Sequence, residues 1–85
     1  MVEITRHIRE QLPGQKDSID RLVAEDGEFL ALCDDFDTCV DALRYWTSSE
    51  EPGAKTRVGE YRDLIRALYE EITQILGKTT KRRQE

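Results

Sequence analysis

The chain has few of the residues from which active sites are built. It contains one histidine, two cysteines, two prolines and one tryptophan among 85 residues. His7 has no second histidine to assist it, and the sequence holds no Gly-rich phosphate loop and no serine-centred nucleophile motif. General acid–base and nucleophilic mechanisms would therefore lack the second catalytic residue that they require. We expect a protein that is not an enzyme and has no cofactor, with His7 at the surface of an exposed helix.

Long hydrophobic runs are also missing. No apolar segment approaches the ~20 residues that a helix needs to cross a bilayer. The N-terminal stretch MVEITRHIREQL has acidic residues and lacks the apolar region and small-residue cleavage site of a secretory signal. These absences predict a soluble, cytoplasmic protein without a transmembrane segment. A chain this short buries only roughly 60% of the surface of its unfolded form, so its core is expected to be thin.

Cys33 and Cys39 lie in the acidic stretch CDDFDTCVD, which raises the question of a metal site. Zinc sites need three or four ligands at short spacings such as Cys-x-x-Cys, and calcium loops need a glycine turn between carboxylates. The stretch has neither, so no metal is expected. On a helix the two cysteines are about 120° apart around the axis and about 9 Å apart along it, too far for a disulfide. We predict two free, buried thiols that pack as small apolar residues.

The aspartates of the same stretch form a group of their own. Asp34, Asp37 and Asp41 lie within about 60° of one another on a helical wheel, which predicts a solvated helix face. Residues 17–51 hold eleven acidic residues and two arginines, a local net charge of −9. The alternative is therefore an acidic docking face, which would attract a basic partner and repel nucleic acid.

Apolar residues recur with helical spacing in two long segments. The first runs from Ile19 to Leu43 with alternating spacings of three and four, interrupted by Asp26 beside Gly27, where we expect a kink or break. The second covers residues 54–76, and Gly77 fits a helix stop. Between them, TSSEEPGAK predicts a turn.

These segments predict an all-α fold. We expect an antiparallel helical hairpin of residues 16–48 and 52–77, with a short additional N-terminal helix over residues 2–12 folded against it. Residues 1–77 would form a single helical domain. Residues 78–85 have no apolar anchor and are expected to form a flexible tail, whose basic residues are Lys78, Lys81, Arg82 and Arg83.

Some apolar residues lie beside the two periodic rows, where the two helices of a hairpin would leave them exposed to solvent. Leu32, Cys39 and Trp46 form a row seven residues apart beside the first segment, and Leu64 flanks the second. We predict that they bind a partner, either a second copy in a four-helix bundle or another helical protein. Two alternatives stay open: a three-helix monomer in which the N-terminal helix covers part of this surface, and a Trp46 that only packs at the end of the hairpin.

The predicted function is accordingly a non-enzymatic helical module for protein–protein interaction or structure, without a small-molecule substrate. The alternative is an accessory protein that associates with a nucleic acid or a membrane surface through the basic tail. The net charge of −5 argues against nucleic acid.

The stretch IDRLVAEDGEFLALCDDFDTCVDAL, followed by YRDLIRALYEEITQIL, resembles the short bacterial helical-hairpin proteins of the YdcH-like kind. Those proteins carry a Leu, an acidic pair, a Phe and a Leu, which here are Leu22, Glu25, Asp26, Phe29 and Leu32. Their later Leu-x-x-x-Ile run matches Leu68 and Ile72. Gly27 stands where the family often has proline, and the N-terminal helix is additional. The resemblance implies a hairpin and a bacterial cytoplasm, and it supplies no catalytic residues.

Overall fold

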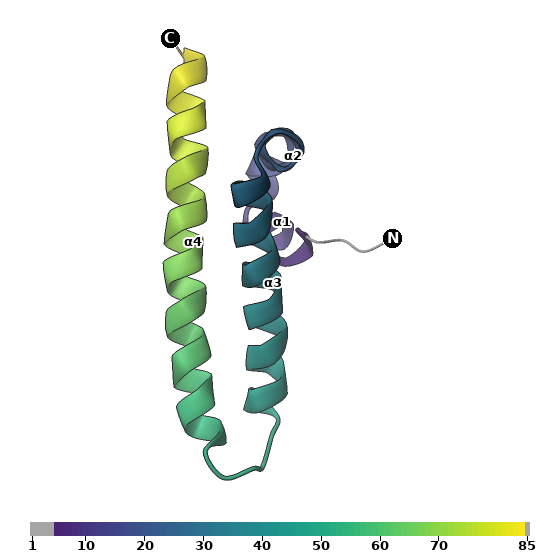
Figure 1. Ribbon diagram of the computed structural model, residues 1–85, viewed down its shortest axis with the longest axis vertical. Helices are drawn as coiled ribbons and strands as arrows, with labels where there is room; N and C mark the ends of the chain where they lie inside the picture. The colour runs from purple at the N-terminus through teal and green to yellow at the C-terminus, as the bar shows by residue number, and fades with distance from the viewer. Residues whose placement is uncertain (1–4, 85) are drawn as a thin grey trace.

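The structure, a computed structural model, describes the backbone of residues 5–84 and the side chains of residues 5–78. Every regular element in the described backbone is helical (Figure 1). The all-α class is therefore confirmed. In chain order the elements are α1 (Arg6–Gln11), the 3-10 turn η1 (Pro13–Gln15), α2 (Lys16–Glu25), α3 (Gly27–Thr47) and α4 (Ala54–Gln84).

Helix α1 is shorter than the segment 2–12 that its sequence predicted. Val2 and Ile4, two of its four expected apolar residues, lie outside the described residues. The helix ends before Pro13, because proline disfavours the helical conformation of the residue that precedes it. The Leu12 N–H still donates to the carbonyl of Ile8 at 3.0 Å, and η1 then redirects the chain into α2.

The predicted break at Asp26–Gly27 is confirmed. Asp26 has an extended backbone (φ −131°, ψ 106°), and its carboxylate accepts the N–H groups of Glu28 and Phe29 at 3.0 and 3.3 Å. This is the N-cap arrangement that satisfies the free amides at a helix start. The predicted first arm of the hairpin, residues 16–48, is therefore two helices, and α2 crosses the start of α3 steeply (Figure 1).

Helices α3 and α4 lie side by side and run in opposite directions (Figure 1). The chain between them turns at Pro52 and Gly53, and Gly53 adopts a φ of 85°, which residues with a side chain rarely adopt. Ala54 is buried directly after this turn. None of the helices in the described part of the chain is long and apolar enough to cross a membrane.

The expected helix stop at Gly77 is wrong, because α4 continues to Gln84. A glycine ends a helix by adopting a positive φ, and among the described residues Gly53 is the one glycine that does so. No proline follows Gly77 to prevent further helical turns. The backbone of residues 78–84 continues α4, and residue 85 lies outside the described residues, so that the flexible tail of residues 78–85 stays a prediction.

The hydrophobic core lies at one end of the α3–α4 pair, where α1 and α2 pack against it. All four helices contribute fully or almost fully buried side chains: Ile8, Ile19, Phe29, Cys33, Phe36, Ile72 and Leu76. Toward the connecting turn the burial decreases. Within residues 38–53 and 55–71, all of which the structure describes, no residue is buried. The molecule therefore has a closed half and an open half.

Replacing Phe36 by alanine tests the assignment of the core. The Phe36 ring is 2% exposed and lies 6.3 Å from the ring of Tyr69, measured between centroids. Because its loss leaves a cavity between α3 and α4, we expect Phe36→Ala to lower the free energy of unfolding by about 3–5 kcal/mol in urea titrations. Asp34→Ala, on the exposed side of α3, should change it by less than about 0.5 kcal/mol. A larger loss for Asp34→Ala would mean that the buried side of α3 is assigned wrongly.

Candidate interaction surface

The four residues predicted to bind a partner lie at different places along the α3–α4 pair. Leu32, Cys39 and Trp46 are half-buried on α3, and Leu64 on α4 is 50% exposed. Leu32 packs against the core in the closed half. Trp46 lies in the open half, where the guanidinium carbon of Arg57 is 5.9 Å from the centroid of its indole ring. Trp46 thus has a packing contact with the start of α4, and Leu64 is the most exposed of the four.

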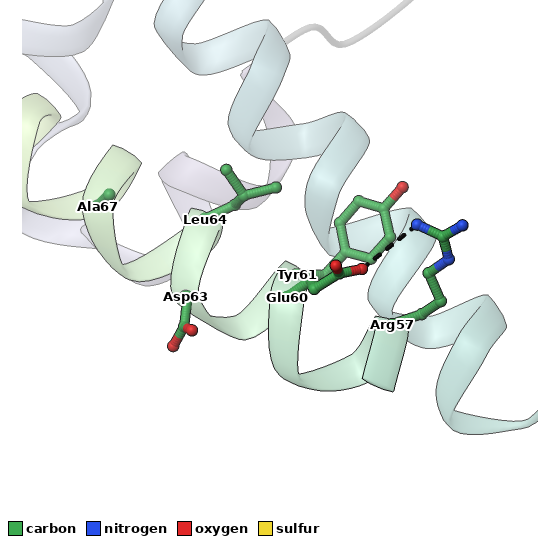
Figure 2. Close-up of a pocket in the computed structure, with 6 residues that line it drawn as sticks. All are labelled: Arg57, Glu60, Tyr61, Asp63, Leu64 and Ala67. Carbon is green, nitrogen blue, oxygen red and sulfur yellow. Dashed lines mark hydrogen bonds and ion pairs between the residues drawn. The ribbon is translucent and has the colours of Figure 1, made fainter. Parts of the chain in front are cut away.

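A shallow pocket on α4 surrounds Leu64, and all of its lining residues belong to this helix (Figure 2). Leu64 and Tyr61 project from the same side of α4, whereas Asp63 points away from them. Arg57 donates to Glu60 at 3.3 Å within the pocket. Arg57 and Ala67, which line this pocket, were not among the residues predicted from the sequence. The signal was present, because they lie seven residues before and three residues after Leu64, which places them on its side of a helix.

A second groove lies between α3 and α4 in the closed half, beside Leu32. Its apolar part is formed by Phe29, Ala31, Leu32 and Ile75. Among the described residues that line it, the polar ones are all acidic, namely Asp26, Glu28, Asp35 and Glu71. The structure therefore places Leu32 and Leu64 in separate depressions of the same pair of helices.

The prediction that His7 is a surface histidine is wrong, because His7 is 5% exposed. Pro13 ends α1 and η1 turns the chain, so that α1 packs on α3. There the backbone N–H of His7 donates to Oδ1 of Asp37 at 3.0 Å, and its Nε2 lies 3.0 Å from Oδ1 of Asp41. His7 thus joins two helices through polar contacts.

The solvated face predicted for three aspartates is correct for two of them. Asp34 and Asp41 are exposed, but Asp37 is buried because α1 lies over it. Burial raises the pKa of the Asp37 carboxyl above its usual value of 3.8, and the backbone N–H of His7 opposes this effect. The sequence held no local signal for this contact, because 30 residues separate His7 from Asp37.

Both cysteines are free thiols. Cys33 is fully buried, and this burial, reinforced by the nearby charge of Asp37, raises the pKa of its thiol to about 11. Cys39 was predicted to be buried as well but is only half-buried, and burial also raises its pKa. Neither thiol therefore has the lowered pKa of a reactive cysteine. Within residues 5–84, no group of three or more His, Cys, Asp or Glu side chains could hold a metal ion.

The pH dependence of stability tests the burial of Asp37. Because the pKa of Asp37 is raised in the folded protein, the folded state binds this proton more tightly than the unfolded state does. At a pH below the usual pKa of 3.8, the contribution of protonated Asp37 to the free energy of unfolding is therefore complete. It declines as the pH rises through the raised pKa of the folded protein. We expect Asp37→Asn to remove this decline in urea titrations that start below the usual pKa of 3.8 and extend to neutral pH. Asp34→Asn is the exposed control, and equal pH profiles for the two variants would contradict the burial.

Thiol reactivity tests the different environments of the two cysteines. With a pKa of about 11, Cys33 holds only about one thiolate per thousand molecules at pH ~8, and its sulfur is enclosed. In folded protein we expect Ellman's reagent to modify Cys39, measured in Cys33→Ala, much faster than Cys33, measured in Cys39→Ala. In urea the two rates should become similar. Equal rates in the folded protein would show that Cys33 is accessible.

The chain matches no family model, no curated protein and no solved structure. The resemblance to YdcH-like proteins therefore stays a prediction from the sequence.

Proposed function

We propose that the protein is a non-enzymatic helical interaction module whose α3–α4 hairpin binds a helical partner, and that this partner is a second copy of the chain. Two hairpins would then form a four-helix bundle. The partner-binding residues are those predicted from the sequence, Leu32, Cys39, Trp46 and Leu64, of which Leu64 lies nearest the centre of the contact.

The observation that supports this proposal is the uneven burial along the hairpin. Helices α1 and α2 cover the closed half, but in the open half Trp46, Tyr61 and Leu68 remain half-buried and Leu64 is 50% exposed. Full burial of one leucine side chain stabilises a protein by roughly 1.5–3 kcal/mol. Covering this half would therefore add stability that the single chain does not obtain.

The small size of the domain favours a second copy of the chain as the partner that buries the open half. A domain of 85 residues has a small core, and self-association is a common way to enlarge one. Two-fold dimers are the commonest closed assemblies, and they require one surface that is complementary to itself. The open half offers apolar side chains next to charged residues of both signs, including Arg57, Glu60 and Asp63.

Sedimentation equilibrium tests the proposal. We expect wild-type protein to change reversibly from the 9.9 kDa monomer to a dimer between micromolar and millimolar concentrations, with a melting temperature that rises with concentration. Leu64→Asp should weaken the dimer at least about tenfold, because it places a charge in an apolar contact. Ala24→Asp adds the same charge at an exposed position of α2 and should have no effect. Wild-type protein that stays at 9.9 kDa throughout would contradict the proposed dimer.

A further inference from the structure

Three exposed residues of α4 lie on one line along the helix. Arg57, Leu64 and Glu71 are seven residues apart, which is almost two turns, so each lies above the next on the same side. Leu64 is half exposed, and Glu71 and the Arg57 side chain are exposed. A leucine midway between a cation and an anion is a pattern that can be complementary to itself.

We propose that two copies pair through α4 in antiparallel orientation, about a two-fold axis at Leu64. This inference rests on the proposed self-association and specifies its geometry. In this pairing, residues equally far from Leu64 face each other. Arg57 of each copy then lies opposite Glu71 of the other copy, and the two Leu64 side chains meet at the axis.

The residues between these positions also fit the antiparallel arrangement. Tyr61 and Ala67 lie three residues to either side of Leu64, so the ring of Tyr61 in one copy faces the small side chain of Ala67 in the other. Tyr61 and Ala67 line the same pocket as Leu64 (Figure 2). A large side chain opposite a small one lets two helices approach closely, as knobs fit into holes in a coiled coil.

The charges select the antiparallel orientation over the parallel one. A parallel pairing of the same α4 face would place Arg57 against Arg57 and Glu71 against Glu71. Like charges at such positions destabilise an interface, whereas the antiparallel pairing brings together two cation–anion pairs. Because of the two-fold symmetry, the single pairing of Arg57 with Glu71 occurs twice in the dimer.

The side chain of Arg57 is partly ordered within the single chain. It donates to Glu60 at 3.3 Å, and its guanidinium carbon lies 5.9 Å from the centroid of the Trp46 ring. A guanidinium group carries five N–H donors, so Arg57 can bind Glu71 of the second copy and keep Glu60. The partial ordering also lowers the entropy cost of forming the new pair.

A charge exchange at two positions tests the pairing. Arg57→Glu alone and Glu71→Arg alone each replace two attractive contacts by repulsive ones, so we expect either to weaken the dimer about tenfold to 100-fold in sedimentation equilibrium at low salt. The double variant restores both contacts with reversed polarity, and its dissociation constant should return to within about threefold of the wild-type value.

The restoration is specific to a contact between copies. Arg57 and Glu71 are fourteen residues apart on one helix, about 21 Å, so they cannot restore each other's environment within a chain. The matched control exchanges Arg66→Glu and Glu70→Arg, two exposed charges of α4 on another side of the helix, and these variants should dimerise like wild type. Circular dichroism must show equal helicity in all variants.

The outcomes distinguish this inference from the proposal on which it rests. If wild-type protein dimerises but the double variant stays as weak as the single variants, the antiparallel pairing is wrong and self-association stands. The same conclusion follows if the control exchange weakens the dimer equally. If wild-type protein remains a monomer at all concentrations, both fail, and the exposed face of α4 belongs to a different partner.

Discussion

Asp26 lies at the junction where α2 ends and α3 begins, and the packing of the N-terminal third depends on the turn at this residue. The backbone N–H of Asp26 donates to the carbonyl of Leu22 at 2.7 Å, while its carboxylate accepts hydrogen bonds from the N–H groups of Glu28 and Phe29 in the first turn of α3. The turn places α2 across the end of α3, so that Ile19 enters the core beside Phe29. It also brings α1 back along α3, where Ile8 is fully buried and His7 meets Asp37.

This folding back divides the molecule into halves that differ in burial. The closed half buries residues from all four helices, and the contact between the His7 N–H and Asp37 is enclosed there. In the open half α1 contacts α3 at the exposed Asp41, and α3 and α4 otherwise hide only the sides that face each other. In the proposed self-association the exposed side chains already lie on formed helices, so little new order would have to be created when a second copy binds.

The periodic features of the fold could be predicted from the sequence, and the contacts that depend on the arrangement of helices could not. Alternating spacings of three and four gave the two long helical segments, and a charged residue beside Gly27 gave the break between α2 and α3. His7 appeared to be exposed because its own helix is short and polar, and nothing local shows that α3 covers it. Gly77 satisfies a rule for helix ends, yet a glycine stops a helix only where its backbone changes conformation. Leu64 was selected from its position beside the apolar row, and the seven-residue spacing of Arg57 and Glu71 from Leu64 can also be read from the sequence, whereas their exposure came from the structure.

The continuation of α4 beyond Gly77 places the most basic stretch of the sequence at one end of the molecule. Up to Leu76 the chain carries nine basic and seventeen acidic residues, a net charge of −8, whereas the residues after it carry four basic and one acidic residue, a net charge of +3. Because α4 extends past α2 and α3 at this end (Figure 1), the backbone of residues 78–84 lies at one end of the 52 Å axis of the molecule. The backbone dipole of α4 points the other way, with its negative end at the basic residues, and it favours the cations there. Two such molecules side by side, each with a net charge of −5, repel each other less when their axes are antiparallel than when they are parallel, because the basic end of each then lies near the acidic part of the other.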